Sequence, residues 1–406
     1  MPRERNLRKH GPADVARRAA AVLVLSAALG AGAAAAQAPA AQRPAATYWV
    51  YVGAESADLL HRVRFGPDGA EVEKTIPAGV LPTETEGPHG LRVDAAGKYL
   101  HVTTGHGLPF GQYWKYALGP DTLVGAPVAL GDFPATLDVT PDGLYAFVVN
   151  FNLHGEHVPS SISVVYTPEN TEVERITTCT MPHGARMNPA GTRLYSACMM
   201  DDQLVELDTN LFQVARRFSV SVGAEGPIEE MHDNAMHAQH MADPAHAMQH
   251  AMEHGEMAAP TCSPTWAEPS PDGRWVYVAC NKANTILQID AEDWRLERTL
   301  ETGTAPYNLA ATPDGRRLVA TLKKQAAVQV FDLSTGESLA TMPSTTTVTH
   351  GVVVSPDSRY AFVSVEGVGA EPGKVDIYDL ETFERVASVE VGQQAGGIAF
   401  WKMEAR

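Results

Sequence analysis

The sequence predicts an all-β fold built from one short unit repeated along the chain. Two observations predict it: a tight turn recurs at a nearly constant spacing, and β-branched and aromatic residues flank that turn on both sides. The chain has 406 residues, of which 44% are hydrophobic and 19% are charged, so it is long enough to bury a large core. We therefore expect a globular repeat protein rather than a fibrous or disordered chain.

The repeated unit is a proline or threonine, a short strand, a tight turn and a second strand. Six such segments align without gaps, and they begin at Pro88, Pro134, Pro182, Pro264, Pro306 and Thr349. Their turn positions, which lie 46, 48, 82, 42 and 43 residues apart, are Gly97, Gly143, Gly191, Gly273, Gly315 and Ser358. In the Pro-Asp-Gly turns, proline presets φ, aspartate bonds to the local backbone and glycine accepts a positive φ. Flanking segments such as YAFVVN and WVYVAC are predicted strands.

Each unit continues with two more predicted strands. The third strands include TILQID (285–290), AVQVFD (327–332) and KVDIYD (374–379). The fourth strands include ERTLETG and ERVASVEVG. Four strands every 42 to 48 residues is the periodicity of β-propeller blades.

The two ends of the chain predict one further blade. The C-terminal segment GGIAFW (396–401) is typical of a first strand that has no partner. The segment TYWVYVGAESADLLHRVRF, which starts at Thr47, offers a second and a third strand without a first. Joining them would pair both chain ends in one sheet and remove two free sheet edges. We therefore expect a seven-bladed β-propeller over residues 47–401.

The repeats also resemble a known family. The units YVACNKANTILQID and LVATLKKQAAVQVFD, with their Pro-Asp-Gly turns, are similar to the YVTN-type repeats of seven-bladed β-propellers. The resemblance covers roughly residues 47 to 401 and implies the fold. It implies no single function, because such propellers serve as binding scaffolds, surface proteins and, in related architectures, lactonases and redox enzymes.

The N-terminal segment 1–38 has the features of an export signal. A basic stretch that ends in Arg17 and Arg18 precedes the apolar run AAAVLVLSAALGAGAAAA and a small-x-small cleavage site at 36–38. We expect a linker over 39–46 and a periplasmic or secreted product. Because the apolar run is about the length of a membrane span, an uncleaved anchor stays open as an alternative. Export by the Sec or by the twin-arginine route stays open as well.

The spacing of 82 residues between two turns contains an insert, 225–260, that is rich in histidine and methionine. Its stretch 229–257 holds six of the fifteen histidines and six of the thirteen methionines. We predict that these side chains bind metal: Met231, His232, Met236, His237, His240, Met241, His246, Met248, His250, Met252, His254 and Met257. Thioethers favour monovalent copper, and imidazole extends the range to divalent copper, zinc and nickel. The segment resembles periplasmic copper- and silver-handling segments, although a polar loop enriched by low-complexity drift is the alternative.

Six further histidines are expected on one face of the propeller. Those that start innermost strands at the same repeat position are His89, His183 and His350. Those that follow second strands are His106, His154 and His157, and the first two of these belong to the predicted metal site. The same starting position in other units holds Ala135, Thr265, Tyr307 and Ala395. The fold therefore does not need histidine there, and several imidazoles that converge at a channel mouth would form a metal site. The alternative is that they only cap strand starts by bonding to the backbone.

The four cysteines allow two interpretations. Cys179 precedes and Cys198 ends one predicted hairpin, and Cys262 and Cys280 do so in the next. Two disulfides, 179 to 198 and 262 to 280, are reasonable in an oxidising compartment, and pairs that cross between the two units stay open. In the other interpretation the soft ligands of monovalent copper are Cys179, Cys198, Met199 and Met200, together with His183.

Charge and missing patterns exclude several function classes. The formal net charge of −17 argues against a nucleic-acid or anionic-lipid partner, because the field of the protein repels both. The sequence contains no C-x-x-C-H for covalent haem and no nucleotide-binding loop. It also has no Ser-His-Asp order and no paired carboxylates at matching repeat positions, so no catalytic residue can be assigned.

The sequence therefore favours an exported β-propeller that binds transition metal, with copper as the best match, over an enzyme. The alternatives are a lactonase-like hydrolase or copper oxidoreductase on the same face, and a scaffold for a periplasmic protein partner.

Overall fold

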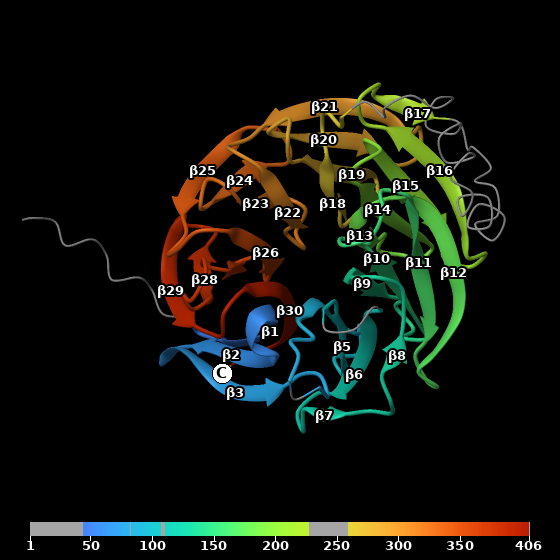
Figure 1. Ribbon diagram of the computed structural model, residues 1–406. Coiled ribbons are helices and arrows are strands. Elements are labelled where there is room, and N and C mark those ends of the chain that lie inside the picture. The colour runs from blue at the N-terminus through green and yellow to red at the C-terminus, as the bar shows by residue number, and fades with distance from the viewer. Residues whose placement is uncertain (1–43, 82, 107–109, 227–258, 406) are drawn as a thin grey trace, which may run out of the picture. The chain divides into compact units, whose positions relative to one another are not determined.

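The computed structural model describes residues 44–81, 83–106, 110–226 and 259–405 of the chain (Figure 1). Apart from the single-turn 3-10 helix η1 (Glu55–Ala57), the regular elements there are strands in antiparallel sheets. The predicted all-β class is thus confirmed. The expected signal peptide (1–38) and most of the linker (39–46) lie outside the described residues, as does the core of the insert (227–258). Within the described part of the chain, no helix has the length and apolar character needed to cross a membrane.

Three sheets come from the first half of the chain and the C-terminus. The sheet that contains both chain ends has the strand order β3 (Gly69–Pro77), β2 (Leu59–Gly66), β1 (Thr47–Ala54) and β30 (Ala395–Glu404). The next sheet contains β4 (Pro88–Val93), β5 (Tyr99–Thr104), β6 (Gln112–Ala117), β7 (Thr122–Leu123) and β8 (Val128–Ala129). The third contains β9 (Pro134–Val139), β10 (Tyr145–Asn150), β11 (Pro159–Tyr166) and β12 (Thr171–Thr180).

The remaining strands form three more sheets. In the nine-stranded sheet, one group of four contains β13 (Pro182–Met187), β14 (Arg193–Cys198), β15 (Gln203–Asp208) and β16 (Gln213–Ser219). The short β17 (Ala224–Gly226) joins it to a second group, which contains β18 (Pro264–Pro269), β19 (Trp275–Cys280), β20 (Thr285–Asp290) and β21 (Arg295–Glu301). A further sheet contains β22 (Pro306–Ala311), β23 (Arg317–Leu322), β24 (Ala327–Asp332) and β25 (Ser338–Pro343). The last contains β26 (Thr349–Val354), β27 (Tyr360–Val365), β28 (Lys374–Asp379) and β29 (Glu384–Glu390).

The first strands of these groups lie together at the centre of the compact unit (Figure 1). Each contacts the first strands of its two neighbours, in the order β4, β9, β13, β18, β22, β26, β30 and again β4. β30 also pairs antiparallel with β1, with Val50 opposite Phe400 and Val52 opposite Ile398. The C-terminal strand therefore belongs to the same sheet as the N-terminal strand.

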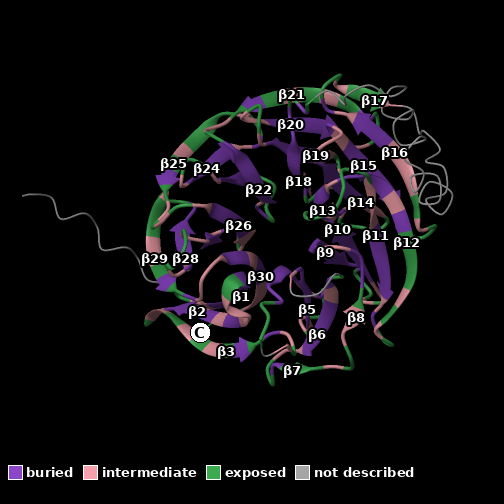
Figure 2. Ribbon diagram, in the orientation of Figure 1, coloured by how far each residue is buried: buried purple, intermediate pink, exposed green. Residues whose placement is uncertain are grey.

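Burial decreases from the centre outwards (Figure 2). The second strands β10, β19 and β27 are buried on both faces, which explains why they have continuous apolar sequences rather than alternating ones. The fourth strands β21 and β29 are mostly exposed or half-buried. Apolar side chains from neighbouring sheets pack against each other, for example Val50 and Phe65 against Phe362 and Ile377.

The predicted turns have the expected backbone. φ lies between 64° and 75° at the five turn glycines and is 59° at Ser358. The predicted side-chain bonds also form: Asp272 accepts hydrogen bonds from the Ser270 hydroxyl at 2.5 Å and from the Arg274 N–H at 3.1 Å. These contacts fix where one strand ends and the next begins.

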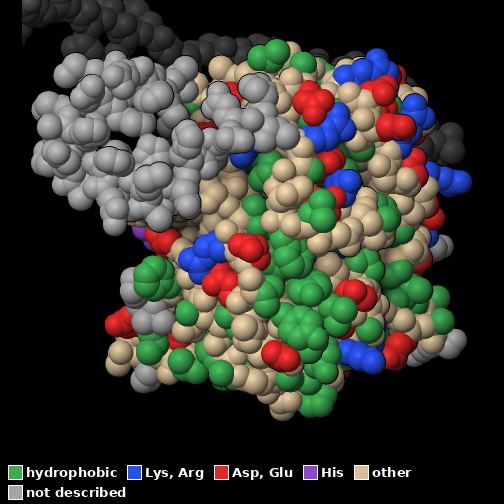
Figure 3. All heavy atoms as spheres, turned by 90° about the vertical axis from the view of Figure 1, so that its right-hand side faces the viewer, with side chains coloured by type: hydrophobic (Ala, Val, Ile, Leu, Met, Phe, Trp, Pro, Cys, Tyr) green, Lys and Arg blue, Asp and Glu red, His purple; other side chains and the backbone are tan. Residues whose placement is uncertain are grey.

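On the outer surface, acidic and basic side chains are interspersed where described residues are visible in Figure 3. Arg216 pairs with Glu225 at 2.8 Å, and Arg193 pairs with Asp208 at 2.5 Å. Exposed pairs of this kind contribute only about 0–1 kcal/mol each. Buried apolar packing, rather than surface charge, therefore dominates the stability of the fold.

Candidate functional site

Three predicted histidines meet where the innermost strands begin. His89, His183 and His350 are the second residues of β4, β13 and β26, and all three are buried. The ring centroid of His89 lies 6.4 Å from that of His183 and 5.6 Å from that of His350. The expected convergence of these imidazoles is present, and we call them the mouth histidines.

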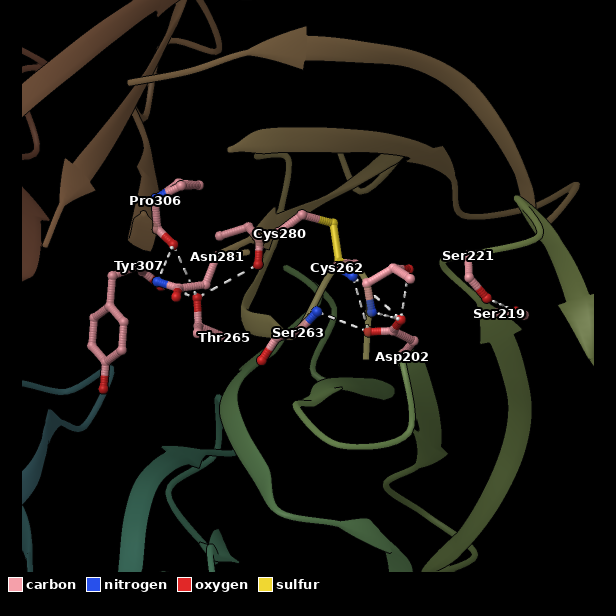
Figure 4. The surroundings of a disulfide bond; sticks show 12 residues. Asp202, Ser219, Ser221, Cys262, Ser263, Thr265, Cys280, Asn281, Pro306 and Tyr307 are labelled. Carbon is pink, nitrogen blue, oxygen red and sulfur yellow. Dashed lines mark hydrogen bonds between the residues drawn. A yellow bond between two sulfur atoms is a disulfide. The ribbon is translucent and has the colours of Figure 1, made fainter. Parts of the chain in front are cut away.

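A tyrosine that the sequence did not single out completes this group. Tyr307 is the second residue of β22, the position equivalent to the mouth histidines. Its ring centroid lies 5.3 Å from that of His183 and 4.7 Å from that of His350. In Figure 4 its side chain extends away from β22 with the hydroxyl at the far end. Its repeat position, which matches that of the three histidines, is the sequence signal that points to it.

The tautomer of His183 is set by its two partners. Nδ1 lies 2.9 Å from the carbonyl oxygen of Thr265, which can only accept, so Nδ1 carries the hydrogen. Nε2 then accepts a hydrogen bond from the Tyr307 hydroxyl at 2.9 Å. Because burial raises the pKa of Tyr307, the phenol stays protonated and can donate.

A buried carboxylate holds two histidines at the edge of this group. Glu55, in η1, lies 2.8 Å from Nδ1 of His89 and 2.6 Å from Nε2 of His106. Burial alone would raise the pKa of Glu55, but the charge of His89 and the hydrogen bonds from both histidines outweigh it and hold the pKa at about 2. The hydrogen bond to Glu55 raises the pKa of His106. Glu55 is therefore ionised at neutral pH.

Lys323 and Glu366 form a charged pair beside Tyr307. The ammonium of Lys323 is 3.2 Å from Glu366 and 4.1 Å from the centre of the Tyr307 ring. Nε2 of His350 lies 3.6 Å from Glu366. Burial would lower the pKa of Lys323, but Tyr307 and Glu366 raise it, and burial is the main cause of the raised pKa of Glu366. Both residues follow second strands, which the repeat places on the histidine side.

Two of the mouth histidines are neutral at physiological pH. Burial, followed by the charge of His89, lowers the pKa of His183 to about 3. Burial and the charge of Lys323 lower the pKa of His350 well below its usual range. Nδ1 of His350 is buried and makes no hydrogen bond of normal geometry with the described residues. Neutral imidazole is the form that binds metal ions.

The other two predicted histidines form an outer pair. The ring centroids of His106 and His154 are 5.8 Å apart. Phe133 lies between this pair and the mouth histidines. Its ring centroid is 4.9 Å from that of His106 and 5.2 Å from that of His89. Of the outer pair, His154 is exposed. The five predicted histidines thus form one group, in which Phe133 contacts three of them and His89 links these to His183 and His350.

The structure corrects the prediction that Cys179 and Cys198 are metal ligands. Cys179 is bonded to Cys198, and Cys262 is bonded to Cys280, so the interpretation as two disulfides is confirmed. A sulfur in a disulfide is not a thiolate ligand, and neither Cys179 nor Cys198 serves as one. Met199, expected beside them, packs instead against an apolar cluster that contains Phe133.

Figure 4 shows how the second disulfide is held. The carboxylate of Asp202 accepts hydrogen bonds from the N–H groups of Cys262, at 3.2 Å, and Ser263, at 2.8 Å. Asp202 follows Cys198 by a few residues, so this contact ties the hairpin of the first disulfide to the start of the second. In the sequence, the insert lies between these two points.

The mouth fits a metal ion only in part. His89 and His183 bond through Nδ1 to Glu55 and to a backbone carbonyl, which is how metal-binding histidines are usually oriented. However, among the residues that the structure describes, no three or more His, Cys, Asp or Glu side chains are placed to hold a metal ion. Nε2 of His183 is occupied by Tyr307. The twelve predicted ligands of the insert, between Met231 and Met257, lie outside the described residues.

Comparison with known proteins finds a solved structure with a similar fold and no family. No family model and no curated protein matches the chain. Among solved structures, it is similar to a chain of Kuenenia stuttgartiensis hydrazine synthase, with 18% sequence identity and a TM-score of 0.58. The match covers 80% of this chain and 92% of that chain. At this identity the likeness concerns the fold alone.

Proposed function

We propose that this chain is an exported seven-bladed β-propeller of the YVTN-repeat type that binds transition metal, with copper as the preferred ion. The cyclic contacts of the seven first strands and the pairing of β30 with β1 support the propeller. The histidine- and methionine-rich insert between two blades supports the binding of soft cations.

The observation that carries the proposal is the contact of three buried imidazoles at one repeat position. The lowered pKa values of His183 and His350 leave both rings neutral, and Glu55 orients the ring of His89. A bound ion would need Nε2 of His183, so the Tyr307 hydroxyl must turn away or become a ligand itself. Residues of the insert would supply further ligands, and the copper would be held more loosely there.

Copper loading followed by desalting tests this function. We expect the protein to retain copper, deletion of 229–257 to lower the stoichiometry, and the deletion variant to keep one firmly bound ion. In that variant, H183F or H350F should weaken the remaining site by about 100-fold or more, because a ligand is lost. H157A, at an exposed histidine, is the matched control and should leave affinity unchanged. Absence of stoichiometric copper in the full chain would refute the proposal.

The neutral mouth histidines also predict acid sensitivity of the metal-free protein. The pKa of His183 is about 3 in the fold, whereas an unfolded histidine titrates near 6.5. The unfolded state therefore binds more protons below pH ~6.5, so the stability present above that pH is lost as the pH falls toward 3.

We expect the free energy of unfolding to fall by about 1.4 kcal/mol per pH unit for His183 between roughly pH 6 and pH 4. Other buried histidines, such as His101, act in the same direction. Urea titrations at several pH values measure this dependence. The free energy of unfolding of H183F should fall less steeply with decreasing pH than that of the unmodified protein, by that amount. An equal dependence on pH in both proteins would show that His183 is not a buried neutral base.

A second candidate function is hydrolysis of a lactone at the same mouth. It is favoured by the hydrogen bond between Tyr307 and His183, with Lys323 beside the phenol, because such a pair can exchange a proton with a substrate. Lactone hydrolysis by metal-free protein that disappears in Y307F would support it. Oxygen consumption that requires copper would instead indicate a copper oxidoreductase.

A further inference from the structure

A pocket lies at the opposite end of the innermost strands from the mouth histidines. It has a volume of about 340 Å³ and is lined by the later residues of β4, β13, β18, β22, β26 and β30. Only a narrow space of about 30 Å³, which His183 and Arg186 both line, separates it from the histidine end. The pocket is within the size range of small-molecule sites, and no step of the metal proposal uses it.

Two arginines bring guanidinium groups to this pocket. Nε of Arg92 bonds to Asp138 at 2.8 Å, and the structure gives its two terminal nitrogens no partner among the described residues. Nη1 of Arg186 donates to the carbonyl of Ala185 at 2.9 Å and to that of Leu137 at 3.3 Å. Its Nε and Nη2 have no partner among the described residues. Several N–H donors therefore stay available.

Arg186 is held firmly in place. Its guanidinium lies 4.5 Å from the centre of the Trp266 ring and forms a cation–π interaction with it. Burial and the nearby charge of Arg92 lower the pKa of Arg186 to about 10, so it is still cationic at neutral pH. The position of this donor is thus fixed before any ligand arrives.

The carboxylates near the two guanidinium groups, in contrast, already have partners. Oδ1 of Asp138 forms an ion pair with Arg92 and accepts a hydrogen bond from the N–H of Val139, and Oδ2 accepts one from the N–H of Met187 at 2.9 Å. Glu268 accepts from the indole of Trp266 at 3.2 Å and from the N–H of Ala311 at 3.4 Å. Of these two carboxylates, only that of Glu268 lines the pocket, and each of its oxygens already accepts one hydrogen bond. The two guanidinium groups leave more N–H donors than this carboxylate leaves acceptors, so the pocket suits a guest that is rich in acceptors.

We propose that this pocket binds a small organic carboxylate. The carboxylate would lie against the guanidinium groups of Arg92 and Arg186, whose planar forks match two oxygen atoms. The hydrocarbon part would contact apolar lining such as Val93, Val352 and Ile398. The net negative charge of the whole protein is screened beyond about 8 Å at physiological salt, so the local guanidiniums decide the sign of the guest.

Calorimetric titration of the metal-free protein with butanoate tests the proposal. We expect saturable binding of butanoate, and at least tenfold weaker binding of 1-butanol and of inorganic phosphate. R186M keeps an unbranched side chain beside Trp266 and removes the donors, and it should weaken butanoate at least tenfold. R92M should also weaken butanoate binding at least tenfold. Because the Arg92 side chain is only half-buried, this variant tests the proposal even if R186M does not fold. R316M, at an arginine whose side chain is 81% exposed, is the matched control.

Each outcome decides the proposal. The proposal is overturned if the unmodified protein does not bind butanoate. It is also overturned if R186M and R92M both bind butanoate as tightly as the unmodified protein does. Phosphate that binds as tightly as butanoate shows an inorganic-anion site and overturns the assignment to organic carboxylates. Because H183F should bind butanoate normally, failure of copper binding at the mouth does not affect this result.

Discussion

A chain that ends at Gly392, and so lacks β30, is expected to lose cooperative unfolding and to become readily digested by proteases. β30 pairs with β1, and it contacts both β4 and β26. Its removal would expose the unpaired edge of β1 and buried side chains such as Val50 and Val52. Each large apolar side chain that loses its packing costs about 2–5 kcal/mol, and a few such losses exceed the 5–15 kcal/mol that typically stabilises a protein.

Thermal unfolding followed by circular dichroism measures this effect, and two point variants of full-length protein control it. I398D places a charge at a position that is 5% exposed and should lower the free energy of unfolding by about 3–5 kcal/mol. M403D, on the same strand at 36% exposure, should change it by less than about 0.5 kcal/mol. Deletion of 229–257 should leave the midpoint unchanged. A truncated chain that melts like the full chain would mean that β30 is not needed to complete the fold.

Much of the fold could be predicted because one local pattern recurs. The third strands at 285–290, 327–332 and 374–379 coincide with β20, β24 and β28, since their apolar alternation and turn residues agree. The fourth strands were placed less well: the expected ERTLETG segment ends two residues beyond Glu301, where β21 stops. Outer strands have few buried side chains, so their ends are weakly encoded. β17, which joins two groups of strands, has no counterpart in the repeat.

The site was predictable only where it follows the repeat. The three mouth histidines stand at equivalent positions, so their convergence follows from the geometry of the strands. Glu55 lies in η1, a turn that the aligned units lack, and no alignment of the repeats could have placed it. Donor and acceptor counts around Arg186 depend on side-chain directions, which the sequence pattern does not contain.

The two ends of the innermost strands differ in the chemistry that they offer. The histidine end combines neutral imidazoles with a buried carboxylate, so it has lone pairs to give to a cation. The arginine end has more spare N–H donors than spare acceptors. Since the narrow space between them has about 30 Å³, the two ends can bind different guests independently.

Loss of both disulfides is expected to lower the free energy of unfolding by about 6 kcal/mol. The bonds Cys179–Cys198 and Cys262–Cys280 close loops with sequence separations of 19 and 18 residues. Loops of this size restrict the unfolded chain by about 3 kcal/mol each. The double variants C179A/C198A and C262A/C280A should therefore each lose about half of the total, and the effects should add approximately if the two hairpins are independent. Urea unfolding under oxidising conditions measures the loss.

The same two double variants, and the cysteine-free protein that combines them, separate the two roles that the sequence allowed for cysteine. Since Cys179 and Cys198 are bonded to each other and buried, the folded protein should react with no thiol reagent until a reductant is added. The cysteine-free protein should still bind copper with unchanged stoichiometry at a temperature where it stays folded. Stability lost with copper retained is the result expected for two structural disulfides on either side of the insert. Copper lost together with Cys179 and Cys198, at unchanged stability, would contradict this structural role.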